Sequence, residues 1–268
     1  MASVSDDAAT IAGRFVSARR AASGLQDYPG ELPATLAEAY AVQDEAIAAW
    51  GQDVVGWKVG RINGALADRY GADRLAGPIF ASQTVFAHGK SPEMPVFARG
   101  FAAAEAEFLL RIARTPPAGQ TRFSLDEAAG LIDAVHVGIE IASSPLGRIN
   151  AIGPVAIISD FGNNNGLVVG DELPDWQSSG FEDWLVDTRI DDVEVGRGAA
   201  SSFPDGAIGS ARFLFELMAE RDIVLRPGQW ISSGAVSGVH DAAAGQKVDV
   251  NFGDKFAISC RLTAARPE

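Results

Sequence analysis

Two glutamates, Glu105 and Glu107, lie two residues apart in an otherwise apolar segment of the chain. Alternate residues of a β-strand point to the same face, whereas residues two apart in an α-helix diverge by about 200°. The apolar flanks, FAAA before the pair and FLLRIA after it, predict a buried strand. Two carboxylates on one apolar face need a proton or a cation between them. The alternative is an acidic pair that faces solvent at a sheet edge.

A third carboxylate, Glu140, lies in a second apolar segment, VHVGIEIAS. Strand alternation puts Gly138 and Ala142 beside it, so this face has room for something other than a side chain. Carboxylate oxygens are ligands that Mg²⁺ or Mn²⁺ prefers, whereas zinc would have only His136 as a nitrogen ligand here. The strand pattern alone leaves open whether Glu140 joins the other two glutamates.

Lys58 is the third feature that could do chemistry. It lies in the strand-like segment VVGWKVG and shares its face with Gly56 and Gly60, which leave space around it. A lysine in such a place can meet a carboxylate or pass a proton. The alternative is a lysine near a strand end whose ammonium group simply reaches water.

Further polar candidates fall in loops. Asp160 ends an apolar run before FGNNNG, where it either forms a turn or lines a pocket. Ser233 and Gly234 belong to the small-residue loop SSGAVSGVH, which ends at His240 and can bring backbone N–H groups close to a ligand. This loop lacks the G-x-S-x-G pattern of serine hydrolases. The glycine-rich stretch at 196–201 has no helix pattern after it, so it does not predict a dinucleotide site.

The composition limits the partners that these residues can serve. The chain has 268 residues, 35 of them acidic and 22 basic, and its formal net charge is −13. Such a charge disfavours nucleic acid and anionic membranes as partners, but not a small anion that meets a local cation. There is no apolar run of membrane-spanning length, and the N-terminus lacks the basic and apolar regions of a signal peptide. We therefore expect a cytoplasmic protein, in which the single cysteine, Cys260, is a small buried residue.

The elements that must position these residues follow from the hydrophobic pattern. Residues 1–50 have helical spacing, and the rest of the chain reads mainly as short strands, among them GPVAIIS at 153–159. A capping box at 124–127 predicts a helix that continues to Val135, and a second helix is expected over about 207–221. We expect an α+β fold in one catalytic domain, 1–268, with a helical N-terminal segment, 1–50, and a strand-rich body, 51–268.

With these motifs in this order, the chain resembles the fumarylacetoacetate hydrolase superfamily, and within it the 2-oxopent-4-enoate hydratase and 4-oxalocrotonate decarboxylase branch. The resemblance runs from about residue 35 to the C-terminus. The segments that carry it are GWKVG (56–60), AEAEF (104–108), GIEIASS (138–144), SDFGNNNGLVVG (159–170) and RPGQWISSGAVSGVH (226–240).

The resemblance implies a mixed β-roll body, a homo-oligomer, and Mg²⁺ or Mn²⁺ held by Glu105, Glu107 and Glu140. It also implies a hydro-lyase of aromatic compound catabolism. Such an enzyme adds water to a 2-hydroxypenta-2,4-dienoate or 2-oxopent-4-enoate type of substrate to give a 4-hydroxy-2-oxo acid.

The resemblance implies that Lys58 lies near the substrate, and a mechanism consistent with the residues gives the other candidates their roles as a hypothesis. Lys58 would bind the substrate carboxylate or relay a proton, and Asp160 and His240 would position water. Ser233 and Gly234 would contact the substrate.

Two other functions stay open. The same kind of site could serve a decarboxylase or a C–C bond hydrolase of a related 2-oxo acid, and the fold could also belong to a binding protein without catalytic activity. One segment departs from the family pattern. Where the family's hydratases usually carry a Thr-Ser stretch and a Gln-Pro-Asp type of segment, this chain reads RINGALADRYGADRLAGPIF (61–80). We therefore expect an altered substrate end of the pocket.

Overall fold

The N-terminal segment is helical, as expected. The computed structural model describes residues 4–268, beginning with helix α1 (Val4–Arg20), and helix α2 (Leu36–Trp50) follows. The two helices pack through apolar side chains that include Phe15 and Val42. Thr35 and Glu38 form a reciprocal capping box at the start of α2, so backbone N–H groups that the helix leaves free find partners.

The larger sheet has eight strands and is mixed. Its order is β2-β1-β10-β5-β6-β7-β3, and β11 pairs with β5. The β1–β10 and β3–β7 pairs are parallel, and the other pairs are antiparallel. Its strands are β1 (Val54–Arg61), β2 (Arg74–Phe80), β3 (Thr84–Phe86), β5 (Phe101–Ile112), β6 (Ile132–Ser144), β7 (Asn164–Glu172), β10 (Trp230–Ser232) and β11 (His240–Asp241).

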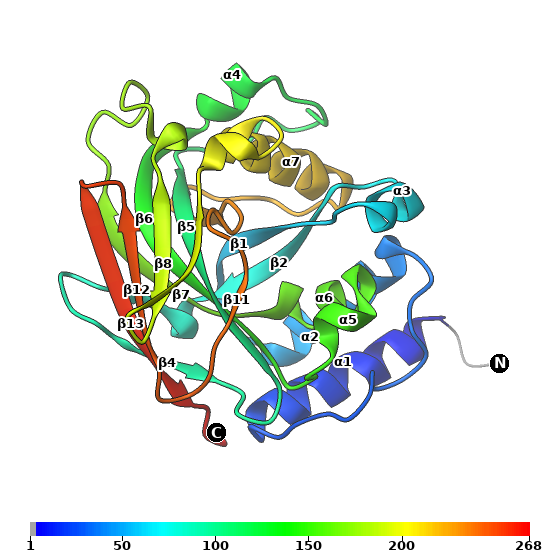
Figure 1. The fold of residues 1–268 in the computed structure, drawn as a ribbon. Coiled ribbons are helices and arrows are strands. Elements are labelled where there is room, and N and C mark those ends of the chain that lie inside the picture. The colour runs from blue at the N-terminus through cyan, green and yellow to red at the C-terminus, as the bar shows by residue number, and fades with distance from the viewer. Residues whose placement is uncertain (1–3) are drawn as a thin grey trace.

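A second, five-stranded sheet packs against one face of the first (Figure 1). Its order is β4-β13-β12-β8-β9. The shared core includes Phe108 from β5, Phe252 from β12 and the fully buried Cys260 from β13. The strands are β4 (Glu93–Val96), β8 (Val186–Ile190), β9 (Val193–Gly198), β12 (Lys247–Phe252) and β13 (Phe256–Ala264).

The remaining helices are short except for α7, and they lie around the sheets (Figure 1). They are α3 (Ala65–Tyr70), α4 (Leu125–Ala129), α5 (Ile149–Ile152), α6 (Pro154–Ser159) and α7 (Gly206–Glu220). Within residues 4–268, no helix has the length and apolar character needed to cross a bilayer. The mixed α+β architecture confirms the expected fold class.

Two local predictions were wrong. The capping box at Ser124 does begin a helix, but α4 ends at Ala129, and Val135 belongs to β6. The run at 153–159 forms helix α6 instead of a strand, with Pro154 in its first turn, where a missing N–H costs little. A short apolar run does not by itself distinguish a buried helix from a buried strand.

Candidate metal centre

Three buried glutamates meet on one face of the larger sheet. Glu105 of β5 lies directly opposite Glu140 of β6, and Glu107 follows two residues along β5 on the same face. Their exposed fractions are 5% for Glu105 and 0% for both Glu107 and Glu140. One carboxylate oxygen from each lies within 4.8 Å of the others. The structure thus brings together all three of the predicted metal ligands.

Two carboxylate oxygens in this cluster lack a partner. The backbone N–H of Gly234 donates to Glu107 Oε2 at 2.6 Å, and Asn164 Nδ2 donates to Glu140 Oε1 at 3.0 Å. The other oxygens, Glu107 Oε1 and Glu140 Oε2, are buried and accept no hydrogen bond from residues 4–268. A buried anionic oxygen without a partner is costly. The donor set therefore fits a hard cation.

The raised pKa values of Glu105 and Glu107 also favour a bound cation. Burial raises the pKa of Glu105 to about 7, although the Lys58 ammonium opposes this rise and Glu140 adds to it. Burial and repulsion from Glu140 and Glu105 raise the pKa of Glu107 well above its ordinary value. Without a cation the cluster therefore takes up protons near neutral pH, and a divalent ion would compete with those protons.

Lys58 of β1 reaches the cluster from the neighbouring part of the sheet. It is 4% exposed, and its Nζ lies 3.3 Å from Glu140 Oε1 and donates to Asn163 Oδ1 at 3.2 Å. Burial lowers the pKa of Lys58, but the three carboxylates outweigh this effect and raise it above its ordinary value. The side chain therefore carries a positive charge at neutral pH.

A close backbone contact puts Asn163 beside Lys58. Gly77 of β2 pairs with Lys58, and a Cβ on Gly77 would lie 2.2 Å from the carbonyl oxygen of Phe161. Gly162, at φ +64°, fits against Gly77 in the same way. These two glycines let the Phe161–Asn163 turn lie on the sheet. The sequence analysis did not single out Asn163, nor Asn164, whose amide bonds Glu140. The feature of the sequence that could have indicated them is the run of three asparagines after Phe161-Gly162.

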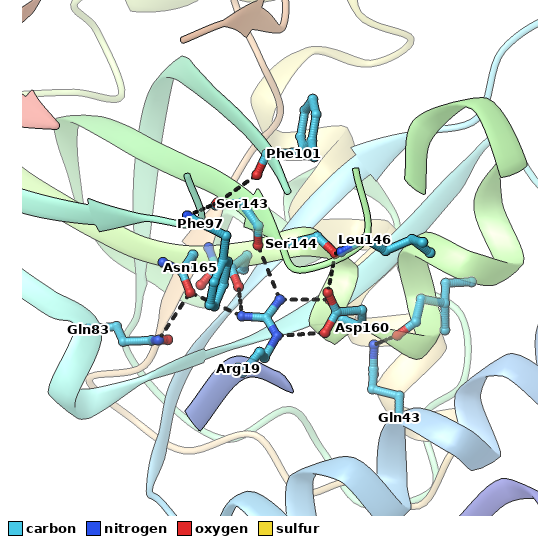
Figure 2. Close-up of polar contacts among 12 residues, drawn as sticks. Arg19, Gln43, Gln83, Phe97, Phe101, Ser143, Ser144, Leu146, Asp160 and Asn165 are labelled. Atoms are coloured by element: carbon cyan, nitrogen blue, oxygen red, sulfur yellow. Dashed lines mark hydrogen bonds and ion pairs between the residues drawn. The ribbon is translucent and has the colours of Figure 1, made fainter. Parts of the chain in front are cut away.

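Asp160 lies in a different network, which Figure 2 shows. Its Oδ1 accepts a hydrogen bond from Arg19 Nε at 2.5 Å, and its Oδ2 accepts one from Ser144 Oγ at 2.5 Å. Arg19 also donates to the backbone oxygen of Asn164, the residue whose amide holds Glu140. Asp160 therefore ties α1 to the strands behind the metal centre, and the structure does not place it where it would position water.

The loop SSGAVSGVH (232–240) contributes to the metal centre through its backbone. Gly234 adopts φ +120°, and its N–H is directed at Glu107, so it supports a candidate metal ligand. Ser233 is buried and its Oγ has no partner among the described residues, so its contact with substrate stays a prediction. His240 pairs with Ala104, which alternates with Glu105 along β5, so its side chain lies on the opposite face of the sheet. The structure does not bring His240 to the cluster.

A cavity of about 370 Å³ opens at the site. Lys58 and Glu105 line it together with the amides of Asn63, Asn150 and Asn163. This arrangement can bind a small molecule with anionic and carbonyl oxygens beside a cation.

Comparisons with known proteins show which solved structures have a similar fold. No family model matches this sequence, and no curated protein matches it. The fold is nevertheless that of 4-oxalocrotonate decarboxylase from Pseudomonas putida G7, complexed with magnesium and adipate. The TM-score is 0.80 at 19% identity, over 96% of this chain and 97% of that one.

Two further structures share the fold less completely. Fumarylpyruvate hydrolase from Pseudomonas aeruginosa, in complex with Mn²⁺ and pyruvate, has a TM-score of 0.55 at 17% identity over 78% of this chain and 89% of its own. A 2-hydroxyhepta-2,4-diene-1,7-dioate isomerase from Mycobacterium marinum has a TM-score of 0.56 at 15% identity. The match covers 80% of this chain and 77% of the isomerase chain. The chain therefore has the fold that these three enzymes share. The likeness to the decarboxylase extends over nearly the whole of both chains and concerns the fold.

Proposed function

We propose that this chain is a divalent-metal-dependent enzyme that acts on 2-oxo acids. The observation that carries the proposal is the cluster of three buried carboxylates within 4.8 Å, two of whose oxygens have no partner in the described chain. Glu105, Glu107 and Glu140 would hold Mg²⁺ or Mn²⁺, as the metal-bound structures of similar fold support. Residues 1–268 would work as one catalytic domain, and assembly into a homo-oligomer stays a prediction.

The proposed reaction adds water to a 2-hydroxypenta-2,4-dienoate or 2-oxopent-4-enoate type of substrate and yields a 4-hydroxy-2-oxo acid. When bound, the cation would supply a Lewis acid that stabilises negative charge on the 2-oxo acid group. Lys58 would bind the substrate carboxylate or move a proton, and Asn163 orients its ammonium group. Gly234 and Asn164 would fix the ligand carboxylates through one hydrogen bond each.

Lys58 is also the best acid–base candidate. Apart from Glu105, which would be engaged by the cation, the titratable side chains that line the cavity are Lys58 and Arg61. Arginine does not lose its proton in proteins. A proton that moves at C3 or C5 of the substrate would therefore pass through Lys58 or through water held in the cavity.

Decarboxylation is the second candidate reaction. The specific observation in its favour is the TM-score of 0.80 with 4-oxalocrotonate decarboxylase, against 0.55 and 0.56 for the hydrolase and the isomerase. A site that stabilises charge on a 2-oxo acid serves either reaction, because both pass through an enolate. A C–C bond hydrolase would use the same chemistry.

One assay separates these functions. The protein, loaded with Mg²⁺ or Mn²⁺, is given a 2-hydroxy-2,4-dienoate, and loss of ultraviolet absorbance is followed while CO₂ and cleavage products are measured in parallel. Hydration predicts loss of absorbance without CO₂. Glu105→Gln should abolish turnover and metal binding, whereas Glu31→Gln, at an exposed position away from the cavity, should change neither. Full activity in the Glu105→Gln variant, or binding of substrate without turnover with either metal, would contradict the proposal.

A further inference from the structure

Arg19, in the last turn of α1, is a buried cation with a hydrogen-bond partner for every donor (Figure 2). A guanidinium group has five N–H donors. Nε donates to Asp160 Oδ1 at 2.5 Å, and Nη1 donates to the backbone oxygen of Asn164 and to Asn165 Oδ1, both at 3.1 Å. Nη2 donates to the backbone oxygens of Ser143 and Asp160, both at 3.2 Å. Asp160 balances the charge, and the other contacts fix the orientation of the group.

The segment between two of these contacts is a left-handed turn. Phe161, Gly162 and Asn163 have φ values of +58°, +64° and +56°. Glycine adopts such values freely and asparagine tolerates them, but they are rare for a bulky residue such as Phe161. A turn of this kind persists only where the surrounding structure holds it in place.

Arg19 holds the turn at both of its ends. It binds the carboxylate and the backbone oxygen of Asp160, directly before the turn, and the backbone oxygen of Asn164, directly after it. Its guanidinium carbon also lies 4.9 Å from the centre of the Phe161 ring. A single side chain of α1 therefore clamps the turn from Asp160 to Asn164.

The residue that follows the turn supports a candidate metal ligand. Asn164 accepts a hydrogen bond from Arg19 through its backbone oxygen, and its side-chain Nδ2 donates to Glu140 Oε1 at 3.0 Å. The other oxygen of Glu140 has no partner in residues 4–268. Groups that hold a ligand side chain in place commonly change metal affinity by ten- to a hundredfold when they are replaced.

We infer that Arg19 is a positioning residue of the metal centre, which clamps the left-handed turn and so keeps the amide of Asn164 against Glu140. This inference rests on the proposed function and adds α1 to the parts of the chain that support the site. Arg19 itself does not line the cavity. Its effect on the cation is therefore exerted through Asn164.

Binding of MnCl₂, measured by isothermal titration calorimetry, tests this role. Arg19→Met alone leaves Asp160 as a buried charge without its partner, so the double variant Arg19→Met/Asp160→Asn, which removes both charges, is measured beside it. The double variant should be more stable in urea than Arg19→Met. It should nevertheless bind Mn²⁺ with a Kd about tenfold above that of the wild type.

Ile11→Ala is the control for a loss of stability alone. Ile11 is a buried residue of the same helix, eight residues before Arg19, or about 12 Å along the helix axis. Its replacement leaves a cavity in the core and should lower the stability of the fold. The Kd for Mn²⁺ should stay at the wild-type value.

A double-mutant cycle tests whether Arg19 acts through Asn164. Asn164→Ala removes the amide that holds Glu140 and should by itself raise the Kd for Mn²⁺ about tenfold. Combined with Arg19→Met/Asp160→Asn, it should raise the Kd of that variant by less than about threefold, because both changes remove the same contact.

The outcomes separate this inference from the proposed function. If Arg19→Met/Asp160→Asn binds Mn²⁺ as tightly as the wild type, or if Ile11→Ala weakens binding equally, the inference is overturned while the metal centre stands. Effects of Arg19 and Asn164 that multiply to about a hundredfold would also overturn it. If the wild type does not bind Mn²⁺, the proposed function fails, and the inference fails with it.

Discussion

Replacing Glu105 with Gln should stabilise the metal-free protein at alkaline pH, although it removes a candidate metal ligand. The pKa of Glu105 rises from 4.5 to about 7 because the carboxyl is buried. The folded state therefore holds this proton more tightly than the unfolded chain does. The stabilising contribution is fully present below the unfolded pKa of 4.5, and it is lost as the pH rises through the folded pKa of about 7. A glutamine amide is neutral throughout and avoids this loss.

The magnitude follows from the two pKa values. At 1.36 kcal/mol per pKa unit, a rise from 4.5 to about 7 corresponds to about 3 kcal/mol in the free energy of unfolding. Between pH 5 and pH 8, the variant should therefore gain about 2 to 3 kcal/mol relative to the wild type. With MgCl₂ at about 100 times its Kd, the wild type should gain about 2.7 kcal/mol and the variant much less.

Urea unfolding in EDTA, followed by tryptophan fluorescence at pH 5, 6, 7 and 8, measures this difference. Glu31→Gln is the control, because Glu31 is exposed and its replacement should leave the pH profile of stability unchanged. A difference between wild type and Glu105→Gln that stays flat from pH 5 to pH 8 would refute the reasoning. So would a wild type that becomes more stable relative to the variant as the pH rises.

Three other substitutions test the supports of the site. Arg19→Met leaves the carboxylate of Asp160 buried without its ion-pair partner. The free energy of unfolding, measured in urea, should fall by about 3 to 5 kcal/mol. A fall of less than about 1 kcal/mol would contradict this. Gly77→Ala puts a methyl group 2.2 Å from the carbonyl oxygen of Phe161. It should lower kcat and destabilise the fold by about 1 to 3 kcal/mol. Unchanged kcat and stability would argue against the close contact. Gly13 lies inside α1, and a Cβ there would have no neighbour within 4 Å. Gly13→Ala should therefore raise the free energy of unfolding by up to about 1 kcal/mol. A loss of stability would show that another group occupies this space.

The parts of the site that a sequence predicts well are those set by local geometry. Glu105, Glu107 and Glu140 could be placed on one face because side chains alternate along a strand, and the cross-strand register then put them together. Gly60 likewise lies beside Lys58, since a Cβ on it would be 3.7 Å from Lys58 Nζ. The same expectation was wrong for Gly56, because a Cβ there would meet the backbone oxygen of Trp230 at 2.6 Å.

The parts that were missed depend on contacts between distant segments. The face that carries His240 is decided by its pairing with β5, and the role of Asp160 is decided by an arginine 141 residues away. Asn163 reaches Lys58 only because the turn that carries it packs on Gly77 of β2. No periodicity or motif spacing contains such information.

Anomalous diffraction from crystals soaked with MnCl₂ and oxalate would examine the metal centre itself. We predict a single strong Mn²⁺ peak bound by one oxygen each of Glu105, Glu107 and Glu140, at distances of about 2 Å, with oxalate completing the coordination. Absence of a peak there at saturating Mn²⁺, or a peak bound by side chains elsewhere, would contradict the account.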